Sequence, residues 1–206
     1  MELAPADPDG ARPAGRRGPK VRGAVLAATL AELADVGYTA LTVENVARRS
    51  GVHKTTIYRR WKDRDGLVAD AVTDLATTRL PFPDTEDIET DLRRFARSLV
   101  SWLSSSTGQA ILQAMVSDAA RIPEIASAKR RFFDDRFQRA GPVVSGAIER
   151  GELPPGTDPA ELVRAVMAPI YLRMRITEEP VDRTTADNAV NAALAAARAG
   201  AITSAL

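Results

Sequence analysis

The sequence predicts an all-α protein of about nine helices in two domains, and three observations indicate this class. Apolar residues recur every three or four positions through most of the chain, which is the period of a helix buried along one face. No segment shows the alternation typical of a half-buried strand. Hydrophobic residues make up 45% of the 206 residues, which is enough to bury a substantial core.

The N-terminal part is predicted to contain an arm followed by one long helix. Residues 1–17 are rich in Ala, Pro, Gly and Arg, so we expect a disordered basic arm. From about Pro19 to Val36 apolar residues follow helical spacing, and Gly37 stands where a left-handed C-cap is expected. Two interpretations stay open for the cations near the arm, solubility or contact with a polyanion: Arg12, Arg16, Arg17 and Lys20.

Three shorter helices are predicted next. Thr42 is the expected N-cap of a helix that ends near Arg49, because a threonine hydroxyl can accept a backbone N–H of the first turn. Gly51 breaks this helix, a third runs from about Lys54 to Trp61, and Asp63 caps a fourth. The apolar positions expected to face inward in the two short helices are Val43, Val46, Ala47, Ile57 and Trp61.

The rest of the chain, residues 67–206, is predicted to form a larger helical domain. The fourth helix continues as far as Pro81, and five more apolar stripes follow it. Asp158 and Pro159 are a strong helix start, and Pro169 predicts a kink inside that helix. The five stripes lie at about 88–102, 111–116, 132–148, 162–174 and 185–199.

The charge of the chain is unevenly distributed. Residues 11–66 hold twelve Lys and Arg against five acids, whereas residues 67–206 hold sixteen against nineteen. This asymmetry is expected when one end of a protein meets a polyanion. The alternative is a basic surface that only confers solubility.

Composition excludes many kinds of site. The chain has no cysteine and a single histidine, His53, which excludes disulfides, thiolate nucleophiles and metal sites that need two histidines. We therefore expect no metal and no cofactor. No apolar run approaches the roughly 20 residues that span a bilayer, and residues 1–20 lack the apolar stretch of a signal peptide. We expect a cytoplasmic protein without a membrane partner.

The segment from Thr42 to Leu67 has the steric pattern of a helix-turn-helix. Two short helices pack at a steep angle only if their contact residues are small and the turn tolerates a positive φ. Ala47 supplies the small contact, Gly51 the turn and Ile57 the apolar plug. The second helix carries short hydroxyls and long cations, which suits a DNA major groove, where base edges are flanked by phosphates.

The segment GYTALTVENVARRSGVHKTTIYRRWKDRDGLV, residues 37–68, resembles the DNA-binding domain of the TetR family of bacterial transcriptional repressors. Further on, GELPPGTDPAELV followed by APIYLRMRITEEP is similar to the C-terminal domain of one large TetR subgroup. The resemblance implies a DNA-binding domain at residues 18–66 and a ligand-binding and dimerisation domain at 67–206. It also implies a homodimeric regulator released from a palindromic DNA operator by a small-molecule effector of unknown identity.

The resemblance also suggests DNA contacts. Thr42 matches a residue that donates to phosphate, and Tyr58 matches the phosphate-binding tyrosine. His53 replaces the more usual serine and is either a weak helix cap or a DNA contact. The other matching positions are Lys54, Thr55 and Thr56 at the start of the recognition helix, Arg59 on it, and the phosphate clamp Lys62 and Arg64.

Several of these residues have structural alternatives. Tyr58 could be a half-buried aromatic, and Arg60 is expected to be solvated on the far side of its helix. Lys62 and Arg64 could simply pair with the neighbouring Asp63 and Asp65.

The larger domain is expected to supply a dimer interface and a ligand pocket. Small or apolar faces of the last two helices could pack against a second copy, or form an internal core: Leu162, Val166, Ile170, Ala186, Ala189, Val190, Ala193 and Ala197. Bulky or soft residues on inward helix faces are pocket candidates, although such residues also build ordinary cores: Phe95, Trp102, Met115, Phe133, Phe137, Met167 and Tyr171.

Two alternatives to a ligand-controlled regulator remain at this point. An all-α enzyme could use the carboxylates of Asp118, Glu124, Asp134 and Asp135, but no pair of them accompanies a base, a metal ligand or a nucleophile. The second alternative is a DNA-binding regulator without a small-molecule inducer.

Overall fold

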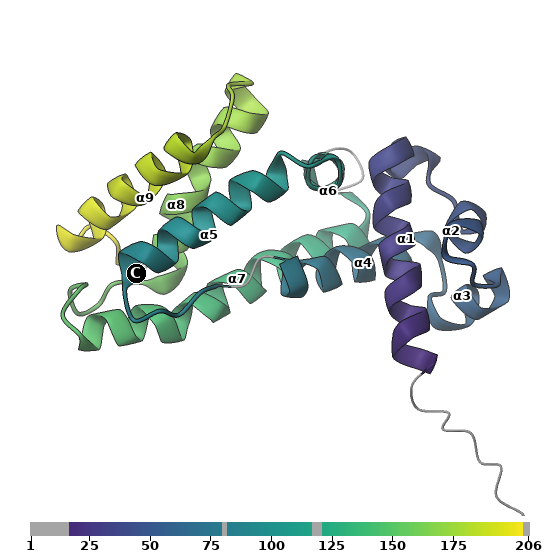
Figure 1. Cartoon of the computed structure of the whole chain (residues 1–206), viewed down its shortest axis with the longest axis horizontal. Helices are drawn as coiled ribbons and strands as arrows, with labels where there is room; N and C mark the ends of the chain where they lie inside the picture. Colours follow the sequence, from purple (N-terminus) through teal and green to yellow (C-terminus); the bar gives the residue numbers. More distant parts are fainter. Residues whose placement is uncertain (1–16, 80–81, 117–120, 204–206) are drawn as a thin grey trace, which may run out of the picture.

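The computed structural model describes residues 17–79, 82–116 and 121–203, and for Arg17 and residues 76–79 it describes the backbone alone (Figure 1). Nine α-helices and one π-helical segment lie in these ranges, and one isolated β-bridge joins Thr157 to Thr203. The predicted all-α class is therefore confirmed. The predicted arm lies outside the described ranges except for Arg17, which is the first residue of the first helix.

The elements follow one another along the chain with short connections. Their bounds are α1 (Arg17–Ala40), α2 (Val43–Ser50), α3 (Lys54–Arg60), α4 (Arg64–Arg79), α5 (Ile88–Leu103), α6 (Ser106–Val116), α7 (Pro123–Glu149), α8 (Pro159–Leu172), the π-helical segment η3 (Arg173–Thr177) and α9 (Arg183–Arg198).

Several helix ends lie where the sequence predicts them. Asp158 caps α8 by accepting the backbone N–H of Glu161 at 2.8 Å, and Pro159 follows at the first helical position. Gly37 has a positive φ of 74°, but its ψ of 173° lies outside the left-handed helical region. A kink therefore interrupts α1 there, and a last turn continues to Ala40. Pro169 lies inside α8, and the backbone becomes π-helical at Arg173.

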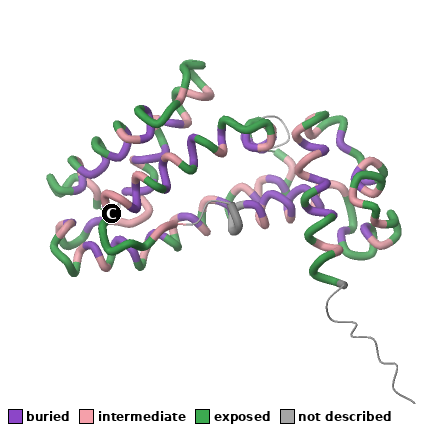
Figure 2. The backbone as a smooth tube through the Cα atoms, in the orientation of Figure 1, coloured by how far each residue is buried: buried purple, intermediate pink, exposed green. Residues whose placement is uncertain are grey.

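Two apolar cores hold the chain together, and the inward faces of the helices are correspondingly buried (Figure 2). The first core is formed by α1 to α4, most of the apolar face of α6, and the first half of α7. The second core is formed mainly by α5, the second half of α7, α8 and α9. Two partly buried aromatic side chains, Trp102 and Phe133, pack against both cores.

Helix α4 belongs to the first core. Its buried residues pack with Val46 and Ile57 of the two short helices and with Ile125 and Phe132 of α7: Leu67, Val68, Ala71, Val72 and Leu75. The predicted division of the chain after residue 66 stays a prediction, and the packing of α4 spans it. The short helices consequently share one continuous core with the beginning of α7.

Close packing also explains one glycine. A Cβ atom built on Gly108 in α6 would lie 2.1 Å from the carbonyl oxygen of Trp102, which no real side chain tolerates. The first turns of α6 therefore press against the end of α5, and only glycine fits between them. In the described helices no stretch is both long and apolar enough to cross a bilayer.

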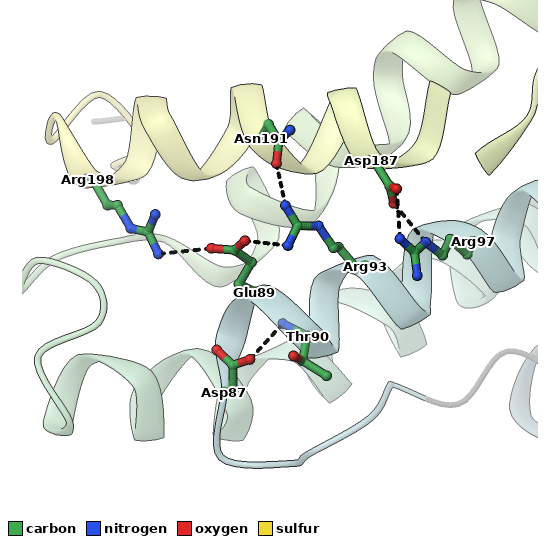
Figure 3. Close-up of polar contacts among 8 residues, drawn as sticks. All are labelled: Asp87, Glu89, Thr90, Arg93, Arg97, Asp187, Asn191 and Arg198. Carbon is green, nitrogen blue, oxygen red and sulfur yellow. Dashed lines mark hydrogen bonds and ion pairs between the residues drawn. The ribbon is translucent and has the colours of Figure 1, made fainter. Parts of the chain in front are cut away.

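Polar contacts join α5 to α9 along the surface (Figure 3). Arg97 donates from Nε and Nη2 to the two carboxylate oxygens of Asp187, both at 2.7 Å. One helical turn away, Arg93 donates to Asn191 Oδ1 at 2.8 Å. Glu89 contacts both Arg93 and, at 3.6 Å, Arg198. These contacts fix α9 beside α5.

The ion pair between Arg97 and Asp187 makes stability depend on pH. Its hydrogen bonds lower the pKa of Asp187 below the usual value for an aspartate. A folded-state pKa below that of the unfolded chain means that the stabilisation is present above about pH 4 and is lost as the pH falls further. We expect Asp187→Asn to lower the melting temperature at pH 7 by roughly 1–3 °C, because exposed pairs contribute little.

Thermal unfolding followed by circular dichroism at pH 7 and at about pH 3 checks this expectation. The difference between wild type and Asp187→Asn should shrink at the lower pH. Asp134→Asn is the matched control, since Asp134 is exposed on α7 and has no ion pair within the described ranges. An equal effect of Asp187→Asn at both pH values would contradict the assignment.

Candidate nucleic-acid interface

The turn between α2 and α3 has the geometry that the sequence predicts. Gly51 adopts the left-handed conformation, with φ 68° and ψ 13°, and forms the C-cap of α2. Val46 and Ile57 are fully buried on either side of the turn, and Ala47 is half-buried. Ile57 therefore fastens α3 to the first core and determines which face of α3 remains in solvent.

Both short helices are capped by side chains. Thr42 Oγ1 accepts the backbone N–H of Asn45 at 3.2 Å, which confirms the predicted N-cap. His53 is the N-cap of α3, and its Nδ1 accepts the backbone N–H of Thr55 at a long 3.5 Å while lying 2.9 Å from Thr55 Oγ1. His53 is exposed, so the cap leaves much of its ring in solvent.

The exposed face of α3 is rich in donors. Tyr58 is 44% exposed, so a substantial part of its side chain lies in solvent. Arg60 is exposed as expected, and its guanidinium lies 5.4 Å from the centre of the Trp61 ring. The residues exposed on the same side of α3 as Tyr58 are Lys54, Thr55 and Arg59, whereas Arg60 lies on the far side, where it lines cavities next to α1 and α7.

Thr56 differs from its neighbours on α3. It is half-buried and lines a cavity of about 430 Å³ between α3 and the start of α1, together with Gly18 and Val21. Thr56 and Tyr58 are two positions apart, which separates their side chains by about 160° around the helix axis. Thr56 is therefore turned toward α1, away from Tyr58, and Arg59 and Arg60 line the same cavity.

The predicted phosphate clamp at the start of α4 is divided in the structure. Lys62 is exposed, but Arg64 is half-buried. Arg64 Nε donates to Asp65 Oδ1 at 3.1 Å, and its guanidinium lies 4.6 Å from the centre of the Tyr38 ring. Burial and the hydrogen bond from its hydroxyl to Asp65, at 2.5 Å, raise the pKa of Tyr38 to about 12. Arg64 thus joins α4 to the end of α1.

One exposed cation beside this face was not among the predicted DNA contacts. Arg48 at the end of α2 is exposed and donates to Asn45 Oδ1 at 3.1 Å. It lines a cavity of about 450 Å³ with His53 and Lys54. Its neighbour Arg49 instead contacts Glu32 and Asp35 of α1. Its position in the last turn of α2, next to the turn that leads into α3, could have indicated Arg48 as a further DNA contact.

The predicted pocket residues fall into two groups. Phe95, Met115 and Met167 are buried in the two cores, with exposures of 1%, 4% and 3%. They pack against other side chains, as core residues do. The other four are half-buried: Trp102, Phe133, Phe137 and Tyr171.

The half-buried aromatics form a connected group where the two cores meet. The Phe133 ring centre lies 6.3 Å from those of both Phe137 and Tyr171, and Phe132 links Phe133 to Trp102. Burial raises the pKa of the Tyr171 hydroxyl. The indole Nε1 of Trp102 is buried and has no hydrogen-bond partner in the described part of the chain.

The predicted dimer interface requires a correction. All eight predicted residues are buried within one chain, in the second core, at exposures of 0–4%: Leu162, Val166, Ile170, Ala186, Ala189, Val190, Ala193 and Ala197. They hold α8 and α9 against α5. The prediction was wrong because α9 is rich in alanine on more than one face, so its inward and outward faces look alike in the sequence. The exposed residues on the other side of these two helices include Arg164, Ala168 and Leu172 of α8 and Asn188, Ala192 and Ala195 of α9.

The carboxylates considered for an enzyme are dispersed. Asp118 lies outside the described ranges. Within those ranges no three His, Asp or Glu side chains come close enough to hold a metal ion. Glu124 and Asp134 are exposed on α7, and Asp135 pairs with Arg139 at 2.8 Å.

Two family models match the chain. Residues 25–71 match the bacterial regulatory proteins of the tetR family, which covers most of α1, all of α2 and α3, and the first half of α4. Residues 82–193 match the tetracyclin repressor-like C-terminal domain, which covers α5 to α8 and most of α9.

Individual relatives agree with this assignment. The chain is 31% identical over 160 residues to the HTH-type transcriptional regulator YdeS of Bacillus subtilis, covering 77% of this chain and 80% of the relative. It is 32% identical over 142 residues to the HTH-type transcriptional regulator AqdR of Rhodococcus erythropolis, covering 69% and 68%. The crystal structure of the TetR family transcription regulator SCO0332 superposes with a TM-score of 0.71 at 32% identity, covering 85% of this chain and 97% of that one.

The fold, the exposed donor-rich face of α3 and the matches over both domains lead to one conclusion. The chain belongs to the TetR family of bacterial regulators and is a DNA-binding transcriptional regulator.

Proposed function

We propose that the protein is a dimeric repressor that reads a palindromic operator with α3 and is released from it by a small molecule. The observation that carries this proposal is the face of α3 opposite the buried Ile57, which presents Lys54, Tyr58 and Arg59 to solvent. Guanidinium and ammonium groups reach guanine acceptors or phosphates, and a phenol hydroxyl donates to phosphate. Binding, not chemistry, is the function that this face supports, and chromosomal DNA places the protein in the cytoplasm.

We assign the DNA contacts to five groups of residues. Thr42 keeps its hydroxyl hydrogen for a phosphate, because the cap uses only its oxygen as an acceptor. His53, Lys54 and Thr55 lie at the start of α3. Tyr58 and Arg59 follow on its exposed face. Lys62 contributes from the turn before α4, and Arg48 joins them from the end of α2.

A dimer follows from the size of this surface. One helix of seven residues touches too few base pairs to select a single site, so two copies must read adjacent half-sites. The exposed face of α8 and α9 suits the contact between copies, since its alanines allow close approach of helices and Leu172 is 51% exposed. A cavity of about 400 Å³ on this face, lined by Pro169, Asn188 and Ala192, could receive side chains of a partner.

The small molecule would bind among the half-buried aromatics where the two cores meet. Trp102 and Phe133 pack against both cores, so a molecule inserted beside them would displace one core relative to the other. The buried indole N–H of Trp102 offers such a molecule a hydrogen bond. A regulator without an inducer remains the alternative, and loss of operator binding on addition of a compound distinguishes the two.

Selection of genomic fragments tests the proposal. Purified protein is mixed with sheared DNA of the source genome at near-physiological salt, and the retained fragments are sequenced. We expect one inverted repeat whose half-sites are about one helical turn apart, because two-fold dimers present two α3 helices at that spacing. Retention of fragments without a shared sequence would contradict specific recognition.

Variants of α3 separate the two kinds of contact. Arg59→Ala should weaken operator binding and reduce the slope of log affinity against log salt by about one, the value for one phosphate cation. Tyr58→Phe should weaken binding by roughly tenfold with an unchanged slope, because a neutral hydroxyl releases no counterion. Fluorescence anisotropy at several salt concentrations measures both. Arg94→Ala, an exposed cation on α5, is the control and should change neither.

A charge on α9 tests the dimer interface. Ala195→Glu would bury two unpaired carboxylates in a two-fold interface, so we expect a shift from dimer to monomer of at least about tenfold in dissociation constant. Light scattering after size exclusion gives the mass. Ala27→Glu on the exposed side of α1 is the matched control. An unchanged dimer in the α9 variant would place the interface elsewhere.

A further inference from the structure

Asp70 of α4 binds two other elements with one carboxylate oxygen. Its Oδ2 accepts the indole N–H of Trp61 at 3.0 Å and the Nη2 of Arg22 in α1 at 3.2 Å. Arg22 also donates from Nη1 to Asp74, one turn further along α4. Three elements, namely α1, the end of α3 and α4, therefore meet at a single carboxylate.

Trp61 is rigidly attached to α3. It is the C-cap of that helix, and its backbone N–H donates to the carbonyl of Ile57 at 2.8 Å. Its side chain is buried to 93%, since only 7% is exposed. A hydrogen bond that holds the Trp61 indole consequently holds the C-terminal end of α3.

Asp70 also faces the larger domain. It lines a cavity of about 510 Å³ whose walls come from two sides, the end of α3 with the start of α4 and the first turns of α7. The α7 wall is formed by Pro123, Glu124, Ser127 and Arg131. The same first half of α7 contributes Ile125 and Phe132 to the core that contains α4. A shift of α7 must therefore be passed to α4 and to Asp70.

We propose that Asp70 is a positioning residue for operator recognition: it fixes the orientation of α3 relative to α4 and hence the separation of the two recognition helices in the dimer. The charge matters, because hydrogen bonds from a guanidinium to a carboxylate are stronger than neutral ones. Partial exposure of Arg22 and Asp70, with side-chain values of 29% and 39%, lets the joint adjust without unfolding the core. This inference rests on the proposed dimeric recognition of an inverted repeat.

The test compares operators of different spacing. The inverted repeat recovered by genomic selection is synthesised in its native form and with one or two extra base pairs between the half-sites. The ratio of dissociation constants for lengthened and native operators measures how rigidly the two α3 helices are held apart. A general loss of stability lowers binding to both operators and leaves the ratio unchanged.

Two variants probe the joint. Trp61→Phe combined with Asp70→Leu removes the indole donor and the carboxylate together, so that neither polar partner is left buried and unsatisfied. Asp70→Asn keeps an acceptor for the indole but removes one of the two carboxylate charges that hold Arg22, the other being that of Asp74. Asp35→Asn is the control, because it breaks an ion pair of α1 with Arg49 without touching α4.

We expect the spacing ratio to fall roughly tenfold in the double variant and about threefold in Asp70→Asn, while Asp35→Asn retains the wild-type ratio. An unchanged ratio in a folded double variant, or an equal fall in Asp35→Asn, would overturn the inference. If circular dichroism shows that the double variant is unfolded, the ratio of Asp70→Asn decides in the same way. A wild-type protein that does not distinguish the spacings would instead refute the proposed dimeric recognition.

Discussion

The burial of the apolar stripe of α4 is the constraint on which the rest of the structure depends. Leu67 and Val68 pack with the two short helices, and this stripe shares its core with Ile125 and Phe132 of α7. The helix-turn-helix is too small to bury a core of its own, so its apolar residues pack in a core shared with α1, α4 and α7. Because the DNA-reading surface shares its core with α7, a movement of α7 changes the position of the two short helices.

Polar contacts then convert this packing into a defined orientation. Apolar contacts are non-directional, whereas hydrogen bonds fix angles and distances. Arg22, Tyr38 and Glu32 place such contacts at three points along α1, toward α4 at two of them and toward α2 at the third. The α2–α3 unit is thereby held from the side opposite its exposed face, which leaves Lys54 and Tyr58 free to meet a ligand as large as DNA.

Local signals predicted the helices and the turn well, because each depends on residues close in sequence. Thr42, Gly51 and Asp158 act within one turn of their own positions. Arg64 was harder, since its half-buried contact with Tyr38 joins residues far apart in the chain. Thr56 was assigned to the DNA-reading group by resemblance. Its partial burial depends on the packing of α3 against α1, which joins residues far apart in the chain. Arg22 and Asp70 gave no signal, because surface charges in sequence do not reveal their partners.

The misassigned dimer residues follow from the composition of α9. Alanine occupies inward positions such as Ala189 and Ala193 and outward ones such as Ala192 and Ala195. The helical periodicity of the sequence therefore does not tell which alanines of α9 are buried in the core and which are exposed on its outer face. The contacts of Arg93 and Arg97 with α9 remove the ambiguity, because they fix one side of α9 against α5 at the surface (Figure 3). With that side and the core side occupied, the small outward alanines remain exposed, and they form the surface that we propose for the contact between two copies.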